Sequence, residues 1–146
     1  AGRVVETGGR SPFLVEPPNA AWQAALHNFG WLRNLRAAGT DLATANARAL
    51  LGDWITTHGR SISGPAWAPE VTAQRIIAWL QHSNLILAGA DLRAFRQFMR
   101  SLPMQVRYLR TMASVMDDGE EKLRARIALE VRLRCGWGNG LVSRPI

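Results

Sequence analysis

The chain has 146 residues, 47% of them hydrophobic, which suits one folded domain and argues against disorder. The net charge of +7 is nearly all arginine, and it favours an anionic partner, although a compositional bias toward arginine produces the same excess. The single cysteine, Cys135, excludes an internal disulfide and a cysteine-rich metal site, and no apolar run approaches the roughly 20 residues that span a bilayer.

Residues 1–18 are expected to form an extended N-terminal segment ahead of a helical region over residues 19–146. A short edge strand is predicted at residues 3–6, and Phe13 and Leu14 are expected to tuck against the helices. Pro17 and Pro18 hold the segment extended. The opening residues carry no secretory signal pattern, and the chain is expected to be part of a longer protein.

The first predicted helix runs from Asn19, a suitable N-cap, to a stop at Gly39. Trp22, Leu26 and Phe29 recur at helical spacing and should face a core. A second face of the same helix carries polar and aromatic side chains at positions i, i+4 and i+7: His27, Trp31 and Asn34.

A second helix is predicted from Thr40 to about His58, with Gly59 ending it, so the first two helices form an antiparallel hairpin. Residues 60–68 are loop by composition. A third helix starts at Pro69 and should run through Leu87. Its core face is Ile76, Ile77, Leu80 and Leu87. A second face repeats the earlier spacing with Arg75, Trp79 and His82.

These two matching sets of side chains allow two interpretations. A flat indole ring flanked by polar groups suits a sugar-binding groove, where the ring stacks on a pyranose and a cation such as Arg75 pairs with an acidic sugar. Alternatively, Trp31 and Trp79 belong to the core and their polar neighbours lie at its rim. Spacing alone leaves both interpretations open.

A fourth helix is predicted from Asp91, and Pro103 should kink or split it near Ser101. Its arginines are expected to spread around the axis as a solvated surface, which argues against a nucleic-acid interface. A last helix is predicted from Glu120 to Cys135, with Leu123, Ile127 and Val131 facing inward.

No catalytic or metal motif is visible. HExxH, GxSxG and CxxC are absent, and His27, His58 and His82 are too scattered to predict a metal site. No cofactor is predicted. Tyr108 is a candidate proton donor or base, with core packing as the alternative.

Three stretches carry a family resemblance: SPFLVEPPNAAWQAALHNFGWLRNLRA, WAPEVTAQRIIAWLQHSNLIL and FMRSLPMQVRYLRTM. Together they resemble the N-terminal helical region of the heparinase II/III-like family, and more closely bacterial members with LHxFxWLRxLRA and WxPxVTAxRxIAWL patterns. The resemblance implies an all-α fold in which antiparallel helical hairpins form an incomplete α/α toroid. It leaves the compartment, cytoplasm or periplasm, open.

The resemblance also implies a function. Enzymes of this family cleave uronic-acid glycans by β-elimination, with tyrosine and histidine as proton-transfer groups. Bacterial relatives carry a Gly-Gly-His-x-Ser-Arg-Asn-Pro motif that this chain lacks. We therefore expect catalytic residues in the remaining domains of the same polypeptide, and a groove wall for an acidic polysaccharide here, built from Trp31, Arg75, Trp79 and His82, with His27 and Asn34 beside them. The alternative is a non-catalytic helical module for an anionic partner such as nucleic acid or a protein.

Overall fold

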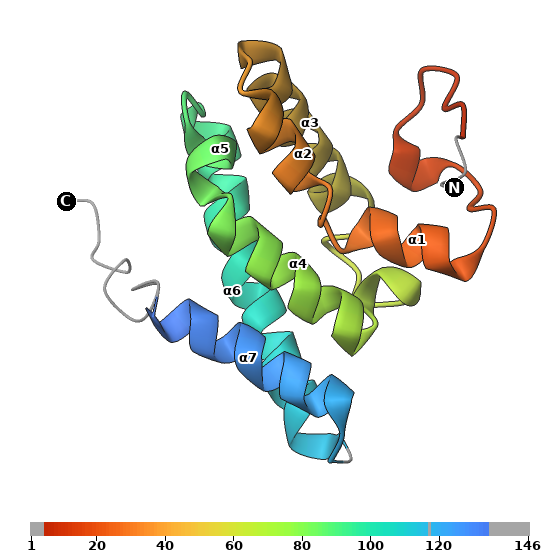
Figure 1. Ribbon diagram of the computed structural model, residues 1–146, viewed down its shortest axis with the longest axis vertical. Helices are drawn as coiled ribbons and strands as arrows, with labels where there is room; N and C mark the ends of the chain where they lie inside the picture. Colours follow the sequence, from red (N-terminus) through yellow and green to blue (C-terminus); the bar gives the residue numbers. More distant parts are fainter. Residues whose placement is uncertain (1–4, 117, 135–146) are drawn as a thin grey trace.

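The computed structural model describes residues 5–116 and 118–134. Within these ranges the chain forms seven α-helices and two 3-10 helices, with no strand (Figure 1). The prediction of an all-α fold is confirmed, and the toroid stays a prediction. Of the predicted edge strand, Val5 and Glu6 are not in a strand, and the rest lies outside the described residues.

The first predicted helix is in fact two, α1 (Ala20–His27) and α2 (Leu32–Ala38). Asn19 caps α1 as predicted, since its side chain accepts a hydrogen bond from the Trp22 N–H at 2.8 Å. The break arises at Phe29, whose φ of +60° is left-handed and costs about 1–2 kcal/mol for a non-glycine residue. Complete burial of the Phe29 ring offsets that cost.

Helix α3 (Asp41–Thr57) begins and ends as predicted, and the Thr40 hydroxyl caps it by accepting from the Ala43 N–H at 3.1 Å. It packs against α2. The loop that follows contains a 3-10 turn, η2 (Pro65–Trp67). The predicted third helix is again two elements, α4 (Pro69–Gln81) and α5 (Ser83–Leu87), because the chain leaves the helical path at His82.

Helix α6 (Leu92–Val115) runs through Pro103 as one element, so the predicted split is absent. Asp91 caps it, accepting from the Ala94 N–H at 2.8 Å. Contacts with α3, α4 and α7 along its length hold the helix together across the missing proline N–H. Helix α7 (Glu120–Arg134) follows, and Cys135 lies outside the described residues.

The orientation predicted for α7 was wrong for Leu123 and Ile127, whereas Val131 is half-buried against the core, as predicted. Leu123 is 58% exposed and Ile127 47% exposed, whereas Ala125 and Ala128 are fully buried. The α4–α7 pair is the most extensively packed in the fold, and small side chains at the contact let two helices approach closely. The prediction for Leu14 was also wrong, since it is exposed while Phe13 is buried.

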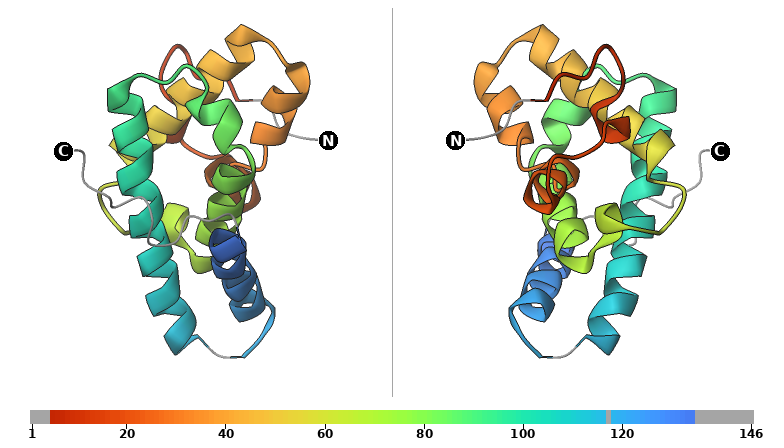
Figure 2. Two further views of the ribbon diagram at one scale, coloured as in Figure 1. Left: turned by 90° about the vertical axis from the view of Figure 1, so that its left-hand side faces the viewer. Right: turned by 90° about the vertical axis from the view of Figure 1, so that its right-hand side faces the viewer.

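Helix α4 lies at the centre, packed against α1, α6 and α7. Figure 2 places α6 at one edge of the molecule and α2 at the other in both views. Aromatic rings dominate the core: Trp54, Trp67, Trp79, Phe29 and Phe98 are all essentially inaccessible.

The arginines of α6 do not spread around its axis, contrary to the expectation. At about 100° per residue, all five fall within an arc of about 100° and extend along about 25 Å of the helix. All are exposed, and α6 contains no acidic residue. We call this surface the α6 arginine face; its members are Arg93, Arg96, Arg100, Arg107 and Arg110.

Candidate functional site

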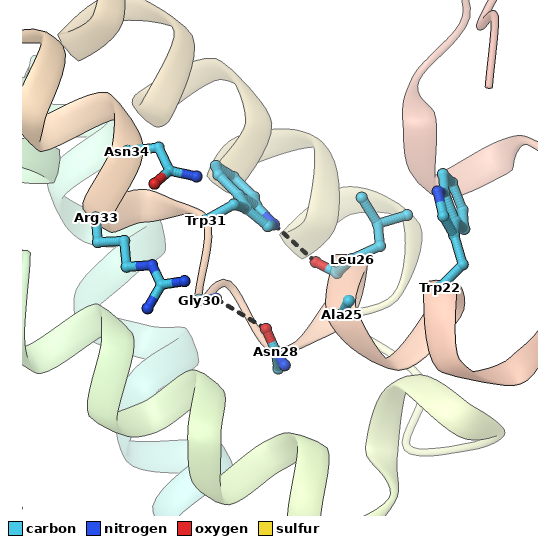
Figure 3. A pocket seen from close by; sticks show the side chains of 8 residues that line it. All are labelled: Trp22, Ala25, Leu26, Asn28, Gly30, Trp31, Arg33 and Asn34. Carbon is cyan, nitrogen blue, oxygen red and sulfur yellow. Dashed lines mark hydrogen bonds between the residues drawn. The ribbon is translucent and has the colours of Figure 1, made fainter. Parts of the chain in front are cut away.

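The break between α1 and α2 opens a groove on the surface. It has a volume of about 540 Å³, within the range of small-ligand sites. We call it the α1–α2 groove. Figure 3 shows the residues that line it: Trp22, Ala25, Leu26, Asn28, Gly30, Trp31, Arg33 and Asn34.

Trp31 is held in a fixed orientation inside this groove. Its indole N–H donates to the Leu26 carbonyl at 3.0 Å, which ties the start of α2 to the end of α1 (Figure 3). One side of the half-buried ring contacts Phe29, with 4.8 Å between ring centroids. Because the N–H is already used, the ring offers a ligand an apolar face and no donor.

Asn28 fixes the shape of the groove. Its Oδ1 accepts from the Gly30 N–H at 2.8 Å, and its Nδ2 donates to the Gln74 Oε1 of α4 at 2.9 Å. Arg33 and Asn34, by contrast, are exposed and have no side-chain partner among the described residues. The groove thus combines apolar rings with a free guanidinium and a free carboxamide.

Arg75 lies elsewhere, in the centre of the core, where its side chain is fully buried. Its partners are neutral: Nη1 donates to the backbone carbonyls of His27 at 3.0 Å and Ala66 at 2.8 Å, and Nε donates to Gln105 at 2.7 Å. The guanidinium carbon also lies 4.0 Å from the centre of the Trp54 ring, a cation–π contact. Burial lowers the pKa of Arg75 to about 9.

His27 is buried beside this cation. Its Nδ1 accepts from the Trp54 indole N–H at 3.1 Å, which requires that nitrogen to be unprotonated. Burial, with further contributions from His58 and Arg75, lowers the pKa of His27 to about 4. His58 packs edge-on against it at 4.7 Å, and its pKa is lowered by burial and by Arg75. Both imidazoles are therefore neutral at pH 7.

Trp79 is fully buried, between Phe29 and Phe98. His82 is half-buried at the junction of α4 and α5. Of the six side chains predicted to form a sugar-binding wall, the structure brings two together in the groove, Trp31 and Asn34. The core contains three of the others: His27, Arg75 and Trp79. For Trp79 this agrees with the alternative interpretation, which placed its ring in the core.

The sequence analysis predicted only two of the eight residues that line the groove, Trp31 and Asn34. Trp22 was expected in the core, and Asn28 and Arg33 were not considered. The available signal was the Asn28-Phe29-Gly30 run, in which an Asn side chain closing onto a following N–H is typical of a turn. Tyr108 is not in the groove: its hydroxyl donates to the Trp67 carbonyl at 2.5 Å.

In the described part of the chain, no group of three His, Cys, Asp or Glu side chains is placed to hold a metal ion. Helices long and apolar enough to cross a bilayer are likewise absent from residues 5–116 and 118–134. No family model, curated protein or solved structure matches this chain.

Proposed function

We propose that this helical region binds an acidic glycan in the α1–α2 groove. The observation that carries the proposal is the groove itself, where the fixed Trp31 ring lies beside the unpaired Arg33 and Asn34 side chains. An indole face stacks on a sugar ring, a guanidinium pairs with a carboxylate, and a carboxamide hydrogen-bonds hydroxyl groups. Arg33 takes the role that the sequence had suggested for Arg75.

We further propose that the parent protein is a heparinase II/III-like polysaccharide lyase. The support is the sequence resemblance along the chain together with the groove. In β-elimination, neutralising the uronate carboxylate stabilises the carbanion that forms when the C5 proton leaves. Arg33 would supply that neutralisation, while the acid and base would come from the remaining domains. The helices would then form one wall of the toroid.

Binding to the groove is tested by calorimetric titration of this chain with oligogalacturonate and, as a neutral control, a malto-oligosaccharide. Arg33→Gln removes a charge-assisted hydrogen bond and should raise the Kd of the acidic ligand about tenfold. Arg93→Gln, an equal charge change on the opposite edge of the molecule, is the matched control. Equal weakening by both variants would refute a site in the groove.

The lyase activity is tested on the full-length polypeptide by ultraviolet absorbance of the unsaturated uronate product, on a panel of acidic polysaccharides. Activity reduced by Arg33→Gln and retained by Arg93→Gln is expected. A full-length protein that binds acidic glycans in the groove without cleaving any of them would refute the lyase proposal and leave the binding proposal standing.

A second candidate function, nucleic-acid binding, is favoured by one observation, the α6 arginine face. Five guanidinium groups along one side of a helix suit contacts with a phosphate backbone. Salt-dependent DNA binding lost on neutralising Arg96 and Arg107, with glycan binding unchanged, would identify this function.

A further inference from the structure

A second concave site lies on the α6 side of the molecule, away from the α1–α2 groove. This α3–α6 cleft has a volume of about 360 Å³. Its walls come from two segments far apart in sequence. The end of α3 contributes Ile55, and the turn that follows it contributes Gly59 and Arg60. The middle of α6 contributes Gln97, Arg100, Ser101 and Met104.

Two cations line this cleft without a counter-ion. Arg60 and Arg100 are both exposed, and neither has a hydrogen bond or ion pair from its side chain to another described residue. Elsewhere in the described chain, Lys122 and Arg124 do form ion pairs. Two guanidinium groups at one cleft repel each other, and an anion bound between them is attracted to both and offsets that repulsion.

The cleft also contains a buried donor with no acceptor. Ser101 is only 4% exposed, and its Oγ accepts from the Gln105 Nε2 at 3.1 Å. The carboxamide of Gln105 cannot turn over, because its oxygen already accepts from Arg75 at 2.7 Å. The hydroxyl proton of Ser101 therefore has no partner among the described residues, and it is available to a ligand.

Backbone packing fixes the wall that carries Arg60. The Gly59 N–H donates to the carbonyls of Trp54 at 3.0 Å and Ile55 at 3.1 Å, closing the end of α3. A Cβ at Gly59 would lie 2.7 Å from the Ile55 carbonyl oxygen, so only glycine allows this close approach. Ile55 and Met104 supply an apolar surface beside the cations.

We propose that the α3–α6 cleft binds a small molecule that carries one oxyanion group, a carboxylate, sulfate or phosphate, on an apolar body. Arg60 and Arg100 pair with the oxyanion, Ser101 donates its hydroxyl proton to it, and the apolar body packs on Ile55 and Met104. The neighbouring α6 arginine face raises the local concentration of anions. This site is separate from the groove and does not depend on the proposed glycan function.

The test is a titration of the ¹⁵N-labelled chain, followed by NMR, at about 0.15 M salt so that diffuse attraction is screened. Phenyl phosphate, phenyl sulfate and benzoate carry the three oxyanions on one apolar body. Inorganic phosphate carries the charge alone, and phenol carries the body alone. The amide signal of Gly59 should shift with the first three ligands, and each should bind more tightly than inorganic phosphate or phenol.

Arg60→Gln and Arg100→Gln should each raise the Kd about tenfold or more, because each removes a charge-assisted hydrogen bond. Arg107→Gln is the matched control, since it lies on the same face of α6 and does not line the cleft; it should change the Kd by less than about twofold. Circular dichroism verifies that each variant is folded. Equal weakening by all three variants, or binding only of DNA and long polyanions, would overturn the proposal.

Discussion

His27 makes the stability of this fold depend on pH. Its imidazole is buried, and its Nδ1 accepts the indole N–H of Trp54 at 3.1 Å. Protonation would place two donors against each other beside the cation of Arg75. Burial, with further contributions from His58 and Arg75, lowers the pKa of His27 to about 4 in the folded chain, against an ordinary value of 6.5 in the unfolded chain.

The sign of the effect follows from linkage. Because the folded pKa is lowered, the unfolded chain binds more protons as the pH falls below 6.5. The contribution of neutral His27 to the free energy of unfolding is fully present above pH 6.5, and it is lost as the pH falls toward 4. With the folded pKa at about 4, the loss between pH 8 and pH 4 is about 3 kcal/mol.

The assay is urea denaturation at pH 8 and pH 4, followed by tryptophan fluorescence. Other groups titrate in the same range, so the wild type is compared with His27→Asn, which keeps a side-chain acceptor for Trp54 and cannot be protonated. The wild type should lose about 3 kcal/mol more than the variant on acidification. Equal losses would refute the argument that His27 is held neutral by its surroundings.

Three further predictions concern the packing. Arg75→Ala leaves two buried backbone carbonyls and the Gln105 carboxamide oxygen without donors, and it should lower the free energy of unfolding by more than about 3 kcal/mol in urea denaturation. A loss below about 1 kcal/mol would contradict a structural role for Arg75 in the core. Gly59→Ala should lower the free energy of unfolding by about 1–3 kcal/mol, because the new Cβ would meet the backbone of Ile55. Gly52→Ala lies in α3 with open space around its Cβ and should raise the free energy of unfolding by about 0.5–1 kcal/mol. Thermal melts that rank the two variants in the reverse order would contradict this geometry. Ala128→Leu should lower the melting temperature by overpacking the α4–α7 contact, whereas Leu123→Gln on the exposed side of α7 should leave the melting temperature nearly unchanged. Equal shifts of the melting temperature in the two variants would mean that α7 packs through its leucines.

The ends of most helices could be predicted because their determinants are local. Asn19, Thr40 and Asp91 each bond an N–H three residues ahead, and Gly39 ends α2 with a φ of +64°. The Asn28-Phe29-Gly30 run carries a turn signal, but phenylalanine itself does not favour a left-handed conformation, and the break inside the first predicted helix was therefore missed. Tertiary burial of its ring, which spacing along the chain cannot show, decides that conformation.

The candidate site was predicted only in part for the same reason. The spacing of Arg75 and Trp79 fits a surface stripe and a core face equally well. What buries Arg75 is a set of neutral acceptors from α1, η2 and α6, and these meet only in the folded chain. In α7, the helical spacing of large apolar residues predicted that Leu123 and Ile127 face inward. The buried residues are instead Ala125 and Ala128, whose small side chains allow a close contact with α4.

The measurement that tests glycan binding in the α1–α2 groove most directly is an NMR titration of the indole N–H signals with oligogalacturonate. Trp22 and Trp31 line the groove, whereas Trp54, Trp67 and Trp79 are inaccessible in the core. Of these five signals, binding in the groove predicts saturable shifts for Trp22 and Trp31 and none for Trp54, Trp67 and Trp79; the sixth tryptophan, Trp137, lies outside the described residues. Saturable binding that leaves Trp22 and Trp31 unchanged, or no binding at all, would contradict the proposal.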